Sequence, residues 1–85
     1  MYSYEITELA PISMIGGYGK AVLKNLTTGL TQYILFKEHD ADKALLSVVF
    51  TNEEWTPINS EAILNATNRH TASEIAIGDI LEITM

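Results

Sequence analysis

Residues 16–29 read GGYGKAVLKNLTTG, a stretch in which three glycines and a lysine precede an apolar run. Backbone amides in a glycine-rich turn can form a nest that binds an anion, and a neighbouring lysine adds a positive charge. A small-anion or nucleotide site in the loop from Gly16 to Lys20 would use Gly17, Gly19 and Lys20.

The established phosphate-binding motifs do not fit this stretch. A Walker loop requires two glycines separated by four residues, followed by lysine and then serine or threonine. Met14 stands where the first of these glycines is needed, and Ala21 follows Lys20. The dinucleotide-binding fingerprint fails at Val22, which occupies the place of its third glycine. We therefore interpret the glycines as the approach to a β-hairpin and retain the anion site as an alternative.

The segment EHDAD at residues 38–42 places several potential metal ligands close together in the sequence. A calcium loop that began at Asp40 would need glycine at its sixth position, where Leu45 stands. A transition-metal site favours more than one imidazole, and His70 is the only histidine besides His39. We interpret the segment as a polar turn and predict neither a metal site nor a cofactor.

Serines, histidines and carboxylates are present, but no sequence signature positions them for catalysis. The GxSxG nucleophile motif is absent. A chain of 85 residues also offers little scaffold to hold a catalytic site rigidly. We predict that the protein is not an enzyme.

The formal net charge of −6 is unevenly distributed. Residues 1–37 contain three lysines and two glutamates, a balance of +1, whereas residues 38–85 contain nine acids and two basic residues, a balance of −7. A negative field repels phosphate backbones, and a single arginine offers little bidentate recognition of bases. We expect no direct binding to nucleic acid.

Composition and length indicate one small folded domain over residues 1–85. The absence of cysteine favours a reducing compartment. The start MYSYEITE lacks the features of a secretory signal, and no apolar run approaches the roughly 20 residues that span a bilayer. We expect a cytoplasmic protein without membrane association.

The clearest structural unit is a hairpin formed by residues 20–26 and 30–36. Thr27-Thr28-Gly29 suits a three-residue loop with glycine in the left-handed conformation. This loop predicts a register that pairs Leu26 with Leu30, Lys24 with Gln32, Leu23 with Tyr33 and Val22 with Ile34.

Both faces of this hairpin are apolar, unlike those of a hairpin with one side in water. One face would carry Val22, Leu26, Leu30, Ile34 and Phe36, and the other Ala21, Leu23, Tyr33 and Leu35. A core should cover one face, and a helix, a second sheet or a partner chain the other. Trp55 suits either a core or an interface. The candidate interface residues are Tyr33, Leu35, Leu23 and Trp55.

The ends of the chain read as strands. Alternation at Tyr2, Tyr4 and Ile6 predicts a strand that ends before Pro11. Leu81, Ile83 and Met85 alternate in the same way after a turn at Gly78-Asp79.

The middle of the chain is less regular. Residues 41–50 fit either a helix capped by Asp40 or a strand, and we favour the strand because the run ends in β-formers. Pro57 restricts a strand at WTPI to an edge. Asn59 or Ser60 can cap a short helix over 61–68.

We therefore predict a β-rich α+β fold: a small antiparallel sheet or partly closed barrel with one short helix near 61–68.

The leading functional hypothesis is a non-catalytic protein-interaction module that self-associates or docks on another protein through an apolar sheet face. One alternative is an acidic inhibitor that occupies a basic, nucleic-acid-binding cleft of another protein. Small size, acidity and absent cysteine resemble small phage-encoded inhibitors, a resemblance of bulk properties that covers no motif. The other alternative is the small-anion or nucleotide binder at the glycine loop.

Overall fold

The computed structural model describes residues 2–10 and 17–84. Within them it contains the strands β1 (Ser3–Ala10), β2 (Gly19–Asn25), β3 (Thr31–Asp40), β4 (Leu45–Thr51), β5 (Pro57–Ala66) and β6 (Ile80–Ile83). Two short 3-10 turns, η1 (Ala41–Lys43) and η2 (Ala72–Glu74), lie in the connections after β3 and after β5. The strands predicted at both ends of the chain are confirmed, although Pro11 and Met85 lie outside the described residues.

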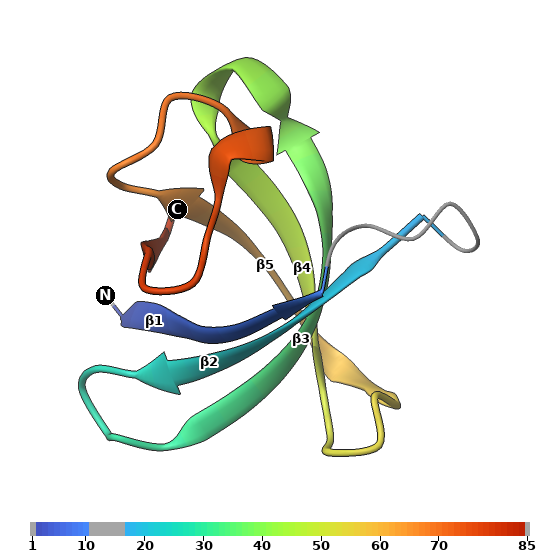
Figure 1. Cartoon of the computed structure of the whole chain (residues 1–85). Helices are drawn as coiled ribbons and strands as arrows, with labels where there is room; N and C mark the ends of the chain where they lie inside the picture. The colour runs from blue at the N-terminus through green and yellow to red at the C-terminus, as the bar shows by residue number, and fades with distance from the viewer. Residues whose placement is uncertain (1, 11–16, 85) are drawn as a thin grey trace.

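The six strands form a closed antiparallel barrel (Figure 1). Each strand pairs with the next in sequence, and β6 closes the barrel by pairing with residues 3–5 of β1 and residues 64–66 of β5. The β-rich antiparallel architecture is therefore confirmed, and the barrel is closed rather than partly closed. In a small barrel alternate side chains fill the interior, so every strand has an inner and an outer face.

The helix predicted over 61–68 is wrong, because β5 occupies Pro57–Ala66. Leu64 and Ala66 are buried two residues apart, which is the period of a strand. Leu64 lies opposite Leu46 of β4, so cross-strand packing outweighs the capping signal before residue 61. The strand favoured within residues 41–50 is confirmed as β4, and Asp40 caps only the 3-10 turn η1 before it.

The predicted register of the β2–β3 hairpin is wrong by one residue. The structure pairs Ala21 with Ile34, Val22 with Tyr33, Leu23 with Gln32 and Lys24 with Thr31. The side-chain oxygen of Asn25 accepts hydrogen bonds from the amides of Thr27 and Thr28, at 2.8 and 3.1 Å. This Asx-type turn begins the loop one residue earlier than expected, so the loop comprises residues 26–29.

Gly29 has a φ of 77°, as the hairpin loop predicted, and its amide donates to the Asn25 carbonyl at 2.7 Å. We expect Gly29→Val to lower the free energy of unfolding by about 1–2 kcal/mol, because a β-branched residue resists this conformation. A Cβ atom at this position would meet nothing within 4 Å, so the loss would be backbone strain alone. The free energies should be compared by urea titration.

Thr27→Val is the matched control for Gly29→Val, because it places the same side chain at an exposed position of negative φ in the same loop. Equal stability of the two variants would contradict the strain at Gly29.

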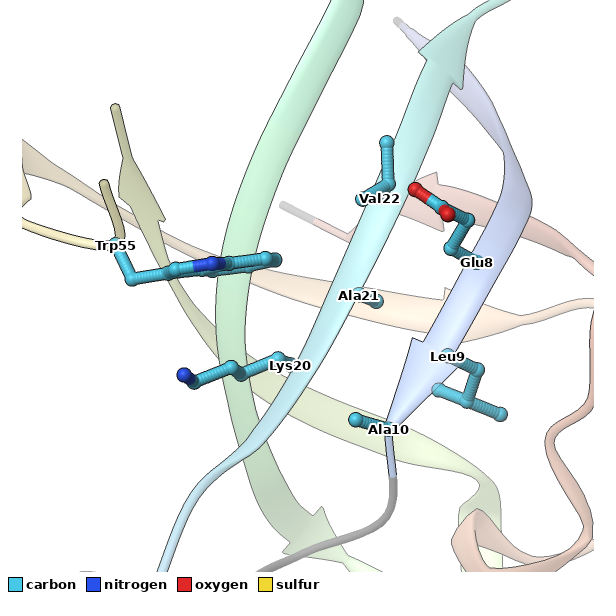
Figure 2. A pocket seen from close by; sticks show the side chains of 7 residues that line it. All are labelled: Glu8, Leu9, Ala10, Lys20, Ala21, Val22 and Trp55. Carbon is cyan, nitrogen blue, oxygen red and sulfur yellow. The ribbon is translucent and has the colours of Figure 1, made fainter. Parts of the chain in front are cut away.

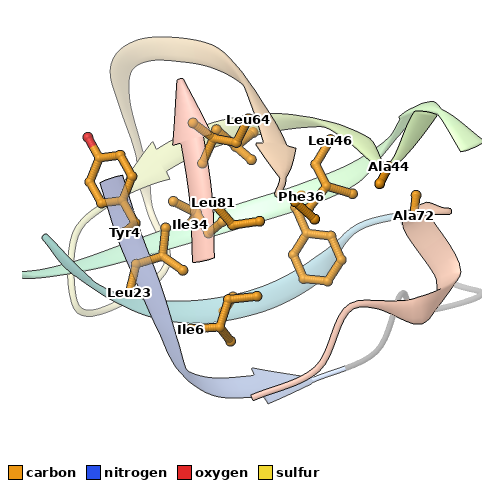
Figure 3. Packing of buried hydrophobic residues seen from close by; sticks show 13 residues of the cluster. Tyr4, Ile6, Leu23, Ile34, Phe36, Ala44, Leu46, Leu64, Ala72 and Leu81 are labelled. Atoms are coloured by element: carbon orange, nitrogen blue, oxygen red, sulfur yellow. The ribbon is translucent and has the colours of Figure 1, made fainter. Parts of the chain in front are cut away.

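The barrel interior is filled by aliphatic and aromatic side chains from all six strands (Figure 3). Its largest fully buried members are Ile6, Leu23, Ile34, Leu46, Leu64, Leu81 and Val48. Phe36 lies against β2 at Gly19, where a Cβ atom would come within 2.4 Å of the ring. Glycine at position 19 therefore lets the ring pack against the backbone of β2.

An ion pair between a buried aspartate and a partly exposed arginine secures the connection between β5 and β6. Asp79 is 2% exposed and accepts hydrogen bonds from Arg69 Nε at 2.8 Å and Nη2 at 2.9 Å. It also accepts from the amide of Ala76 at 2.7 Å. The hydrogen bonds from Arg69 hold the pKa of Asp79 below its ordinary value, against the opposing effect of burial.

Candidate interaction surface

The outer face of β2 and β3 carries apolar side chains that do not reach the barrel interior. On β3, Tyr33 and Leu35 alternate with the buried residues Ile34 and Phe36, so they point outward and are each half-buried. Val22 of β2 lies directly opposite Tyr33 and also points outward. The strand pairing therefore brings three apolar side chains together outside the core.

The turn between β4 and β5 places Trp55 over this face. The side-chain oxygen of Asn52 accepts from the amides of Glu54 and Thr56, at 2.9 and 3.0 Å. The backbone of Asn52 closes the same turn, because its carbonyl accepts from the amide of Trp55 at 3.0 Å. One asparagine thus orders the whole segment that carries the indole.

Trp55 adopts an unfavourable backbone conformation in this turn. Its φ is 64°, in the left-handed region where a bulky residue is an outlier. The β2–β3 hairpin uses Gly29, at a φ of 77°, for its own left-handed position. The left-handed conformation disfavours an L-residue by roughly 1–2 kcal/mol relative to glycine. The turn therefore holds a tryptophan where glycine would be the less strained residue.

The indole of Trp55 contacts both strands of the hairpin. Its ring centroid lies 5.3 Å from that of Tyr33 in an edge-to-face arrangement, with an interplanar angle of 88°. The ammonium of Lys20 lies 5.2 Å from the indole centroid, and the two side chains run alongside each other (Figure 2). These contacts leave Val22 only 8% exposed although it lies outside the barrel. We call the set Lys20, Val22, Tyr33, Leu35 and Trp55 the aromatic face.

An open groove of about 280 Å³ borders the aromatic face (Figure 2). Its lining combines three members of that face with Glu8, Leu9, Ala10 and Ala21. Glu8 and Leu9 follow a β-bulge in β1, which shifts the register with β2 between Ile6 and Glu8. A bulge bends its strand, and the groove lies beside this bent part of β1.

A second lysine and a second tyrosine extend the surface. The ammonium of Lys37, three residues before the end of β3, lies 5.4 Å from the ring centroid of Tyr18. Lys20 lies opposite Leu35 in the pairing of β2 with β3, and Lys37 is two residues beyond Leu35. Both lysines are exposed. The outer face of the hairpin therefore combines aromatic rings with positive charge.

The structure brings together three of the four predicted interface residues, Tyr33, Leu35 and Trp55. Leu23 is not among them: it is fully buried in the barrel core, so its assignment to the same face as Tyr33 is wrong. The one-residue shift in register is the reason, because it pairs the inward side of β2 with Ile34 and Phe36. Val22 was missed as a member of this face for the same reason.

The three residues proposed for an anion site have separate environments. Gly17 is exposed with a φ of 76°, Gly19 is buried against Phe36, and the ammonium of Lys20 lies over Trp55. Gly16, the start of that loop, lies outside the described residues. The anion site stays a prediction. Lys20, one of its three residues, is also a member of the aromatic face through its contact with Trp55.

Residues 2–10 and 17–84 contain neither a candidate metal centre nor a candidate membrane-spanning helix. No group of three His, Cys, Asp or Glu side chains there is arranged to hold a metal ion. No helix in the same part of the chain has the length and apolar character needed to cross a membrane.

Comparisons with known proteins add no functional assignment. No protein-family model matches the sequence, and neither a curated protein nor a solved structure matches the chain. Function is therefore inferred from the side chains of the chain itself.

Proposed function

We propose that the protein is a non-catalytic interaction module that docks on another protein through the aromatic face. The observation that carries the proposal is the position of Trp55, which is held at a φ of 64° on the outside of the barrel. Bulky residues in sparsely populated backbone conformations occur preferentially at functional sites, where the strain is retained for what the side chain does.

The chemistry of the face also supports docking. Tryptophan and tyrosine are the residue types that most often dominate the binding energy of protein interfaces. Tyr33 and Trp55 are already in contact, so binding would require little further ordering of their rings. The barrel has a complete interior core without them.

The proposal can be tested with two variants that leave the interior unchanged. Trp55→Gly removes the indole and also relieves the left-handed strain, so the barrel should remain folded. Tyr33→Glu places a charge on the outer side of β3, where it can reach water. We expect both variants to keep the circular dichroism spectrum of the wild type and to lose at least tenfold in affinity for the native partner.

The partner should be captured from native cells with tagged wild-type protein, and its affinity then measured with purified components. Ile77→Glu is the matched control, because Ile77 is 64% exposed and lies outside the aromatic face. The expected result is a partner lost by Trp55→Gly and Tyr33→Glu and retained by Ile77→Glu. Equal retention of the partner by all three variants would refute docking through this face. If the wild type is dimeric by mass and Tyr33→Glu is monomeric, the partner is a second copy of the protein.

A further inference from the structure

We infer that the aromatic face binds an extended protein segment that carries, on one side, two carboxylate side chains two residues apart and a neighbouring apolar anchor. This inference rests on the proposed function and names the chemistry of the partner. It is carried by the distribution of positive charge around the apolar side chains.

Basic residues are concentrated on the hairpin that carries the aromatic face. Of the five basic residues in the chain, Lys20, Lys24 and Lys37 lie on β2 and β3. Lys43 and Arg69 are paired with Asp40 and Asp79, respectively. By contrast, the ammonium groups of Lys20 and Lys37 lie over aromatic rings, and neither forms an ion pair with a carboxylate of the described residues.

Negative charge lies at the borders of this surface. Glu8 of β1 lies opposite Val22, and Glu61 of β5 lies opposite Val49, the β4 residue that pairs with Leu35. The centre therefore combines Leu35 with two lysines, and the flanks are acidic. A carboxylate of the partner is attracted to the centre and repelled from both flanks, which favours a segment that follows the hairpin.

The spacing of the two lysines suits an extended segment. Lys20 lies opposite Leu35, and Lys37 is two positions along β3 from Leu35, so the lysines are diagonal neighbours across the strand pair. The backbone positions of diagonal neighbours on paired strands are separated by roughly 7–8 Å. In an extended chain, side chains two residues apart are about 6.6 Å from each other on the same face. Two acidic residues at that spacing could each reach one lysine.

The same surface is less suited to a nucleic acid. Single-stranded nucleic acids bind by stacking their bases on exposed aromatic faces. Here the lysine ammonium groups lie over the rings of Trp55 and Tyr18. The net charge of −6 opposes a phosphate backbone, and Arg69 is engaged by Asp79. An acidic peptide can place its few negative charges next to the lysines. The acidic protein therefore repels such a peptide less than it repels a nucleic acid, which has a phosphate at every nucleotide.

A symmetric dimer in which the aromatic faces of two copies pack against each other is also disfavoured. Such an interface places the same patch of both subunits in contact, so it would bring Lys20 and Lys37 of one copy close to those of the other. Like charges in contact cost free energy at an interface. The surface is therefore complementary to an acidic partner and not to itself.

The test is a selection of short random peptides displayed on phage, carried out in parallel against the wild type, Trp55→Gly and the double variant Lys20→Glu/Lys37→Glu. Peptides enriched on the wild type should carry Asp or Glu within two residues of Leu, Phe or Trp. A synthetic peptide of the most enriched sequence should bind the double variant about tenfold more weakly than the wild type and weaken as salt is added. Lys43→Glu, which makes the same charge change outside this face, should bind this peptide like the wild type.

Four results would overturn the inference or the proposed function on which it rests. Enriched peptides without acidic residues, or an affinity that the double variant leaves unchanged, would refute an acidic partner while leaving docking on the aromatic face intact. Equal enrichment on wild type and Trp55→Gly would refute the proposed function itself. Binding of a thymidine oligonucleotide to the wild type, lost in the double variant, would assign the surface to nucleic acid instead.

Discussion

Leu23→Ala is expected to lower the free energy of unfolding by about 3–4 kcal/mol, whereas Leu35→Ala should lower it by only about 1 kcal/mol. Leu23 is fully buried in the barrel interior, so its truncation leaves a cavity. Leu35 points outward and is half-buried, so its truncation removes less contact and leaves no enclosed void. A small domain has a limited reserve of stability, and the loss at Leu23 would consume much of it.

Guanidinium chloride titration followed by tryptophan fluorescence measures both variants in one experiment, because Trp55 is the only tryptophan. Circular dichroism in the far ultraviolet checks that the signal reports the whole barrel. Equal losses at the two positions would contradict the register of the β2–β3 hairpin and, with it, the separation of the core from the aromatic face.

Asp79→Asn is expected to lower the free energy of unfolding at pH 7 by about 2–3 kcal/mol, because it removes charge-assisted hydrogen bonds from a buried carboxylate. The wild-type carboxylate has a lowered pKa in the folded state, mainly through the hydrogen bonds from Arg69. Its contribution to stability is therefore fully present above its unfolded-state pKa of about 3.9 and is lost as the pH falls through the folded-state pKa.

The difference between Asp79→Asn and the wild type should consequently shrink below about pH 4. Urea titrations at a series of pH values measure this dependence. Asp42→Asn is the control, because Asp42 is exposed and its side chain has no described hydrogen bond or ion pair. A difference between Asp79→Asn and the wild type that stays constant down to the acid limit would show that Asp79 does not carry the pH-dependent stability.

Several local features could be predicted from residue patterns because their causes are local. Alternation at Tyr4 and Ile6 indicated β1, and the alternating run near Leu81 indicated β6. Gly29 was correctly assigned a left-handed conformation, since the turn itself requires a residue with positive φ. The β-rich class followed from these strands and from the two apolar faces of the hairpin.

The errors occurred where a local signal competed with pairing across strands. Asn59 and Ser60 resemble a helix cap, but residues 57–66 gain backbone partners and inward packing as β5. The loop of the hairpin looked like three residues around Gly29, but Asn25 starts the turn one position earlier through its side-chain oxygen. That single shift moved Leu23 from the candidate interface into the core.

The sequence by itself determined the β-rich character of this protein, the left-handed glycine of its hairpin, and the presence of more apolar strand surface than one sheet face needs. Only the tertiary structure decided that the strands close into a barrel, which side of β2 faces inward, and that Trp55 lies over Tyr33 and Lys20 outside the core. The physical reason is the distance along the chain over which each effect acts. Strand propensity and turn chemistry act over a few neighbouring residues, whereas register and closure depend on contacts between residues far apart in the chain, and a shift of one residue exchanges the two faces of a strand.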